Sequence, residues 1–179
     1  ILMNLSKIKI LTLIIICFSC NKTLNNKNPN IILIMADDLG WTDLSFMGSN
    51  YYQTPNIDRL AKSGITFYNA YASATNCSPS RASMLSGKYT TEHGIFTVGD
   101  SERGNKKTRK LIPIENKEEI GQDFFLIPEM LKTLGYTNGH FGKWHLNGLR
   151  GPGVPIIDSY PNGPQDFGFQ KWVSVTNFF

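Results

Sequence analysis

Residues 77–81 read Cys77-Ser78-Pro79-Ser80-Arg81, and no other stretch of the chain is as informative. Pro79 suits the first turn of a helix, where its missing N–H would have no partner. Arg81 then lies one turn after Cys77, on the same face of the helix. A permanent cation would thus stand beside a thiol at a helix N-terminus, where the backbone favours anions. The competing interpretation is a buried structural cysteine, because free Cys is among the most buried residue types.

The sequence on both sides of this stretch alternates between strand and helix patterns. It predicts strands over 31–36, 65–72 and 136–141, and helices over 54–63, 77–86 and 128–134. This order predicts an α/β fold, with a mostly parallel sheet and helices on both faces. The segment from Gly99 to Gln122 is rich in charge and poor in apolar residues, which predicts a long solvated loop of a kind that is often functional.

Length and charge limit the classes of function. With 179 residues, 41% of them apolar, the chain is long enough for one domain with a core. The net charge of +4 comes from Lys7, Lys9, Lys22 and Lys27, the only charges before residue 28. From residue 28 onward the basic residues number 18 − 4 = 14 and match the 14 acidic ones, so we expect no nucleic-acid partner.

The N-terminus resembles an export signal. Two lysines precede the short apolar run Ile10–Phe18, which suits the core of a secretory signal. Ser19-Cys20 resembles a lipoprotein cleavage site, with a plain signal peptide as the alternative. We therefore expect a signal over 1–19, lipidation at Cys20, a polar tether over 20–29, and a location in the periplasm or at the cell surface, held to the membrane by the lipid. Cys77 would then be the one remaining thiol, without a disulfide partner.

Two further motifs carry candidate chemistry. Asp37 and Asp38 follow the first predicted strand, and adjacent carboxylates favour Ca²⁺ or Mg²⁺ over zinc. The alternative is a pair of turn residues before Gly40. Lys143 and His145 would share one face of an extended segment, with aromatic neighbours that suggest a packed site rather than a solvated lysine and a structural histidine.

Taken together, the chain resembles the N-terminal part of a formylglycine-dependent sulfatase, arylsulfatase-like and of the alkaline phosphatase superfamily. Four segments carry the resemblance in order: the strand ending in Asp37-Asp38, the helix 54–60, the element 77–87, and 135–146 with its Gly142-Lys143-Trp144-His145 motif. The resemblance implies an alkaline-phosphatase-like sulfatase domain over 30–179, of which the C-terminal part is missing, so that the 179-residue chain itself would be inactive.

The resemblance also implies a role for each matching residue. Cys77, oxidised to formylglycine by a maturation enzyme, would attack the sulfur of a sulfated small molecule or glycan. Arg81 would hold the formylglycine hydrate, Lys143 would bind a sulfate oxygen, and His145 would help to expel sulfate. Asp37, Asp38 and the matured Cys77 would bind Ca²⁺ in preference to Mg²⁺. These residues would provide half of the ligands in the coordination shell of the ion.

Alternatives remain open from the sequence. A phosphonate or phosphodiester hydrolase of the same superfamily can use the same matured cysteine. An inactive, lipid-anchored envelope protein would also retain part of the fold. His93 lies near the matching region and could line the pocket, whereas His140 is expected to be structural.

Overall fold

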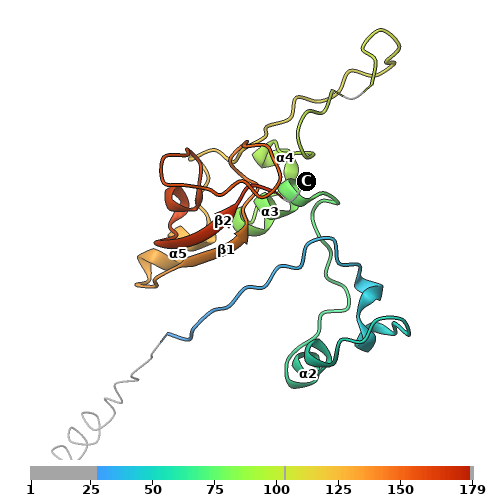
Figure 1. The fold of residues 1–179 in the computed structure, drawn as a ribbon, viewed down its shortest axis with the longest axis vertical. Coiled ribbons are helices and arrows are strands. Elements are labelled where there is room, and N and C mark those ends of the chain that lie inside the picture. The colour runs from blue at the N-terminus through green and yellow to red at the C-terminus, as the bar shows by residue number, and fades with distance from the viewer. Residues whose placement is uncertain (1–27, 103, 178–179) are drawn as a thin grey trace, which may run out of the picture. The chain divides into compact units, whose positions relative to one another are not determined.

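A computed structural model describes residues 28–102 and 104–177 (Figure 1). The chain divides into two compact units, Ile1–Ala36 and Asp37–Phe179. The predicted signal segment, Cys20 and most of the predicted tether lie outside the described residues. In the described part of the first unit, residues 28–36 form neither a helix nor a strand. Within the described ranges, the helices are all too short or too polar to cross a bilayer.

Two of the predicted strands are wrong. Residues 31–36 and 65–72 are not strands, and most of their large apolar side chains are exposed. A strand needs a neighbour that pairs with its backbone N–H and C=O groups. Among the described residues, the two paired strands are at 139–143 and 171–175, so an apolar run alone does not make these segments strands.

The segment after Asp38 is held by a compact polar network. Two short 3₁₀ turns, η1 (Trp41–Asp43) and η2 (Ser45–Met47), precede α2 (Pro55–Ser63), which begins as predicted after Thr54. Ser45 and Thr54 each accept the backbone N–H of the other. Their hydroxyls both donate to Asp58 on α2, at 2.8 Å, and the network fastens η2 to the start of the helix.

The predicted helix over 77–86 is confirmed. It forms α3 (Cys77–Ser86), which ends where Gly87 takes the left-handed conformation at φ 69°. The short α4 (Thr90–His93) follows. His93 is fully buried and accepts the N–H of Ile95 at its Nδ1, so its Nε2–H donates to the Ser83 hydroxyl on α3, at 2.9 Å. This contact joins the middle of α3 to the last residue of α4.

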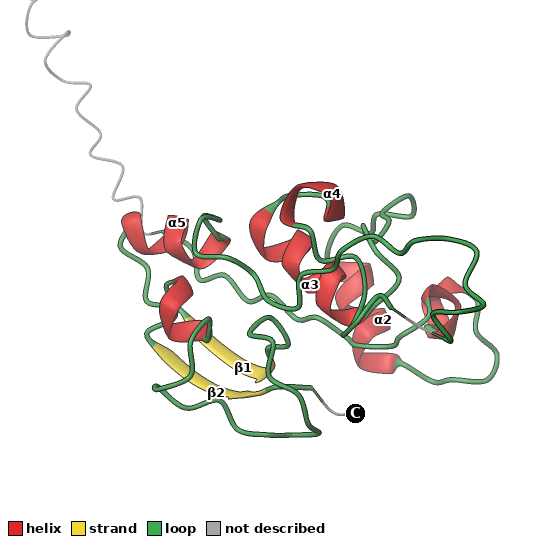
Figure 2. Ribbon diagram, turned by 90° about the horizontal axis from the view of Figure 1, so that it is seen from above, coloured by secondary structure: helices red, strands yellow, loops and turns green. Residues whose placement is uncertain are grey.

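The sheet of the second unit is small and parallel. After α5 (Ile127–Thr133), β1 (Gly139–Lys143) pairs with β2 (Lys171–Val175), and the two lie side by side in Figures 1 and 2. β1 corresponds to the strand predicted over 136–141 but starts later, while β2 is a strand that the sequence analysis did not predict. The 3₁₀ helix η3 (Pro164–Phe167) precedes β2.

Apolar side chains from α3, from the end of β1 and from the loops build one core. Its buried members are Ala82, Leu85, Ile95, Ile120, Leu126, Trp144, Leu146, Ile156 and Phe167. Trp144 lies at the centre of an aromatic group with His140, Phe167 and Phe169, and its indole N–H donates to the Asn162 carbonyl at 2.8 Å. Because Lys143 precedes Trp144 directly, this packing fixes the position of the lysine at the end of β1.

Candidate active site

The reactive candidate, Cys77, is the first residue of α3. It is half-buried and its thiol is free. Ser78, Pro79 and Arg81 of the same helix are buried, so the start of α3 is packed while the cysteine keeps some access to solvent. The orientation of the helix puts the positive end of its dipole at this thiol, as the sequence analysis predicted.

Three charged residues that are far apart in the sequence meet beside this helix. One oxygen of the Asp37 carboxylate accepts a hydrogen bond from Arg81 Nη2 at 3.1 Å, and the other accepts one from Lys143 Nζ at 2.6 Å. Arg81 also donates to the Lys143 backbone carbonyl through Nη1. The side chains of Lys143 and Arg81 are only 2% and 9% exposed, compared with 24% for Asp37. We call these three residues the ion cluster.

The ion cluster carries two cations and one anion. Burial by itself would raise the pKa of Asp37, but the hydrogen bonds and charges of Lys143 and Arg81 outweigh it and lower that pKa. Asp37 is therefore ionised at neutral pH, and the three members of the cluster together sum to one positive charge. A partly buried site with an excess positive charge favours an anionic ligand.

His145 lies close enough to the ion cluster to feel its charges. Burial, together with the cations Lys143 and Arg81, lowers the pKa of His145 to about 4, against a smaller opposite effect of Asp37. The imidazole is therefore neutral at pH 7 and able to accept a proton. His145 also has φ 59°, which is uncommon for a side chain of this size. A residue held in this conformation by its surroundings is frequently part of a functional site.

Asp38 also has a positive φ, 55°, and is exposed. The chemistry of the Asp37 and Asp38 carboxylates suits a hard cation such as Ca²⁺. Two carboxylates alone do not complete a calcium site, however. The described residues contain no group of three or more His, Cys, Asp or Glu side chains that could hold a metal ion. The donors that are present fit part of a calcium shell.

A cavity of about 210 Å³ opens beside His145. Its walls come from the start of α3 and from the loops on either side of it: Ser78, Val98, Gly99, Glu118, His145, Gly148, Leu149, Arg150, Gly151 and Asn177. We call it the His145 pocket. Three buried polar atoms of these residues, Ser78 Oγ, His145 Nδ1 and Asn177 Oδ1, have no hydrogen-bond partner among the described residues.

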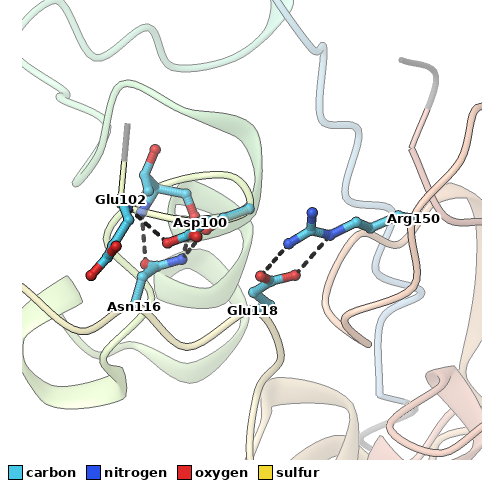
Figure 3. A network of polar contacts seen from close by, with 7 residues as sticks. Asp100, Glu102, Asn116, Glu118 and Arg150 are labelled. Carbon is cyan, nitrogen blue, oxygen red and sulfur yellow. Dashed lines mark hydrogen bonds and ion pairs between the residues drawn. The ribbon is translucent and has the colours of Figure 1, made fainter. Parts of the chain in front are cut away.

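Figure 3 shows the ion pair of two residues that line this pocket, Arg150 and Glu118, and an asparagine, Asn116, that holds the neighbouring loop. Arg150 donates to both oxygens of Glu118, through Nε at 3.1 Å and through Nη2. Asn116 accepts the N–H groups of Phe96 and Thr97 and donates to the Gly99 carbonyl, which fixes the loop at the wall. None of these three residues was predicted from the sequence as a site residue. The only signal for two of them was their place in the long charged loop predicted over 99–122.

The two other histidines lie apart from this chemistry. His93 is bonded to Ser83 and Ile95 and is not among the residues that line the His145 pocket. His140 packs against Trp144 and Phe169 and lies 2.6 Å from the Ser174 hydroxyl. Burial, with a smaller effect of the Arg81 charge, lowers the pKa of His140 to about 4, and both environments are those of structural residues.

Comparison with known proteins agrees with this geometry. A family model described as Sulfatase matches residues 29–178. The chain is 46% identical over 129 residues to a protein named Sulfatase from Formosa agariphila, an alignment that covers 67% of this chain and 23% of that protein. It is 40% identical over 150 residues to the N-acetylgalactosamine-6-sulfatase of Rattus norvegicus, covering 83% of this chain and 26% of the relative. The chain thus spans about a quarter of the length of these curated relatives.

A solved structure shows the same likeness in three dimensions. The crystal structure of Ps i-CgsB in complex with k-i-k-neocarrahexaose matches 84% of this chain and 29% of that chain, with a TM-score of 0.63 and 32% identity. Together with the parallel pair β1 and β2 and the helices around it, this likeness confirms the predicted α/β, alkaline-phosphatase-like fold class. The family model covers most of the residues, including the ion cluster and Cys77. The chain therefore belongs to the sulfatase family.

Proposed function

We propose that the protein to which this chain belongs hydrolyses sulfate esters, using a formylglycine made from Cys77. The observation that carries the proposal is the pair of buried cations, Arg81 and Lys143, beside the helix that begins with Cys77. The family membership and the name of the rat relative favour a sulfate ester over a phosphodiester, and they favour a sulfated sugar as the substrate.

Arg81 and Lys143 would bind the transferring sulfuryl group. Its oxygens gain negative charge in the transition state, and fixed donors in a site that excludes water stabilise that charge most. Both side chains are already held by Asp37, so they need little reorganisation when the substrate binds. Removing one such donor typically lowers kcat by about 10²–10³. We expect a loss of this size for Lys143→Ala.

His145 would act as the base that releases sulfate. The hydrated aldehyde of formylglycine offers two hydroxyls on one carbon, so that one can bond to sulfur while the other later loses its proton as the carbonyl reforms and sulfate leaves. His145 is suited to take that proton because it is neutral at pH 7. His145 lines the same pocket as Ser78, the second residue of α3.

Asp37 and Asp38 would provide two of the oxygen ligands of a Ca²⁺ ion. When bound, the ion would add positive charge beside the sulfate oxygens. Calcium takes roughly six to eight ligands, so the remaining ones must come from water, substrate or other residues. Calorimetric titration of the protein with Ca²⁺ tests this, and binding that is the same in Asp37→Asn as in wild type would contradict it.

The maturation of Cys77 provides a direct test of the function. After co-expression with a formylglycine-generating enzyme, the peptide with Cys77 should show the mass of the aldehyde and should react with a hydrazide. Cys77→Ala should remove both this label and the turnover of a sulfate ester. Lys88→Ala, just beyond the end of α3, is the matched control and should keep both. An active protein with an unmodified thiol at Cys77 would refute the proposal.

A further inference from the structure

We propose that residues 104–114, which we call the basic loop, dock on an anionic lipid surface. The lysines of the basic loop meet the lipid phosphates, and the apolar residues that follow them enter the boundary between head groups and acyl chains. The inference is independent of the proposed function, because the basic loop contributes no residue to the ion cluster or to the His145 pocket. It is also separate from the lipid expected at Cys20.

The first argument comes from the concentration of charge. Within the basic loop four residues are cations and none is acidic: Lys106, Lys107, Arg109 and Lys110. The chain from residue 28 onward is balanced overall, so this excess is local. The three lysines are exposed, and none of them forms an ion pair with another described residue, whereas Arg109 pairs with Glu102 at 3.6 Å. Anionic lipids attract such a cluster of unneutralised cations.

The second argument comes from the apolar residues beside the lysines. Leu111, Ile112 and Ile114 are 81%, 98% and 58% exposed, and they begin directly after Lys110. Single exposed apolar side chains are common, but three within four positions form a patch. Membrane-surface segments combine basic residues with apolar residues that enter the head-group boundary. A soluble polyanion would attract the lysines and leave the apolar side chains in water, so the combination favours a lipid surface.

The third argument comes from the position of the basic loop. Figure 1 shows it extending away from α4 and from the strands β1 and β2. Its two ends are tied together, since the Ser101 hydroxyl donates to the Ile114 carbonyl at 2.5 Å. Near its start, the Asn105 carbonyl accepts the N–H of Thr108 at 3.1 Å, and this turn carries the first two lysines. A bilayer is flat, and a loop that projects from the protein can contact it without hindrance from the rest of the chain.

The charges set the expected strength of binding. One lysine near an anionic bilayer strengthens binding about fivefold, so the three exposed lysines together contribute about 10²-fold. This attraction falls off within a Debye length, which shrinks from about 10 Å at about 0.1 M salt to about 3 Å at about 1 M. Salt should therefore weaken the contribution of the lysines but not that of Ile112.

The test is co-sedimentation of the full-length protein with vesicles, in a Cys20→Ala background so that a lipid at that residue contributes nothing. One set of vesicles contains equal parts of phosphatidylcholine and phosphatidylglycerol, and the other contains phosphatidylcholine alone. In about 0.1 M salt the protein should bind the anionic vesicles about 10²-fold more tightly. Replacing the three exposed lysines of the basic loop by Gln should remove this difference.

Lys132→Gln is the matched control for the lysine variant. Lys132 is an exposed lysine on α5, which lies away from the basic loop in Figure 1. This variant should bind both kinds of vesicle as the wild type does. Because all the substituted side chains are exposed, each variant should also keep the Tm of the wild type. A lower Tm in the loop variants alone would show that the basic loop packs against the rest of the protein, and would overturn the inference.

A second variant, Ile112→Ser, separates a lipid surface from a soluble polyanion. It should weaken binding to anionic vesicles about tenfold at low and at high salt, because the loss of apolar burial is not screened. It should leave binding to heparin, a soluble sulfated polysaccharide, unchanged. Unchanged vesicle binding in Ile112→Ser would make the basic loop a site for polyanions in general and would overturn the proposal.

Two further results would also overturn the inference. One is failure of the wild type to bind anionic vesicles, as expected if another part of the full-length chain covers the basic loop. The other is equal binding by the wild type and the lysine variant. None of these measurements depends on turnover, so their outcome leaves the proposed function to be judged by its own test.

Discussion

The ion cluster predicts that two substitutions will differ in their effect on stability. Asp37→Asn keeps the shape of the side chain but removes the counter-ion of Lys143 and Arg81, which are 2% and 9% exposed. Lys143→Met removes one of the two cations and leaves Asp37 paired with Arg81. The first change takes the Asp37 carboxylate from two buried charges of like sign, whereas the second leaves Asp37 and Arg81 as a pair.

The magnitudes follow from burial. Removing one partner of a buried ion pair typically costs about 3–5 kcal/mol because it leaves the other charge uncompensated, so a change that leaves the remaining charges paired should cost less. Because Asp37 is 24% exposed, water can partly compensate, and we expect about 3 kcal/mol for Asp37→Asn. For a chain of this size that corresponds to a fall in Tm of about 6–12 °C. For Lys143→Met we expect about 1 kcal/mol or less.

The assay is urea and thermal unfolding followed by circular dichroism, in the presence of a chelator so that bound metal does not contribute. The double variant also takes the Asp37 carboxylate from Arg81, so it should be less stable than Lys143→Met, and the shared Asp37–Lys143 contact should make its cost smaller than the sum of the two single changes. If Asp37→Asn unfolds within about 0.5 kcal/mol of the wild type, or if Lys143→Met is the more damaging change, the charge balance assigned to this cluster is wrong.

Two further predictions concern the core and pH. Trp144→Ala should lower the free energy of unfolding by about 3–5 kcal/mol, because Trp144 is only 1% exposed. Trp41→Ala should change it by less than about 0.5 kcal/mol, because Trp41 is 72% exposed. Unfolding in urea measures both changes. The pKa of His140 falls from 6.5 in the unfolded chain to about 4 in the folded one, so between these values the unfolded state binds the extra proton. Stability should therefore decline as pH falls from 6.5 to 4, less steeply in His140→Gln, and an equal slope in both proteins would contradict this assignment.

Local signals explain which elements could be predicted from the sequence. The start of α2 at Thr54-Pro55 and the end of α3 at Gly87 depend on residues within a few positions, and both are where the sequence predicted them. Strands depend on partners far along the chain. The apolar run 31–36 has the composition of a strand but lacks a pairing neighbour among the described residues, and β2 was missed because its pattern is unremarkable without β1.

The candidate site likewise has parts that could be predicted from the sequence and parts that could not. The motifs at Cys77, Arg81, Lys143 and His145 were recognisable because their spacing resembles a known family. The contacts of Lys143 and Arg81 with a single carboxylate, Asp37, could not be derived from spacing, since they depend on how β1 and α3 pack. The Arg150–Glu118 pair joins two loops 32 residues apart, and neither loop has a pattern that points to the other.

The ion cluster also has a consequence for the order in which parts of the protein fold during synthesis. Its contacts join residues separated by 44, 62 and 106 positions along the chain. At about 5–20 residues per second on the ribosome, Lys143 is synthesised roughly 5–20 s after Asp37. Contacts of such long sequence separation are slow to close, because loop-closure entropy must be offset before they form. We therefore expect the cluster to close late, after the helices, and substitutions within it to act mainly by speeding unfolding rather than by slowing folding.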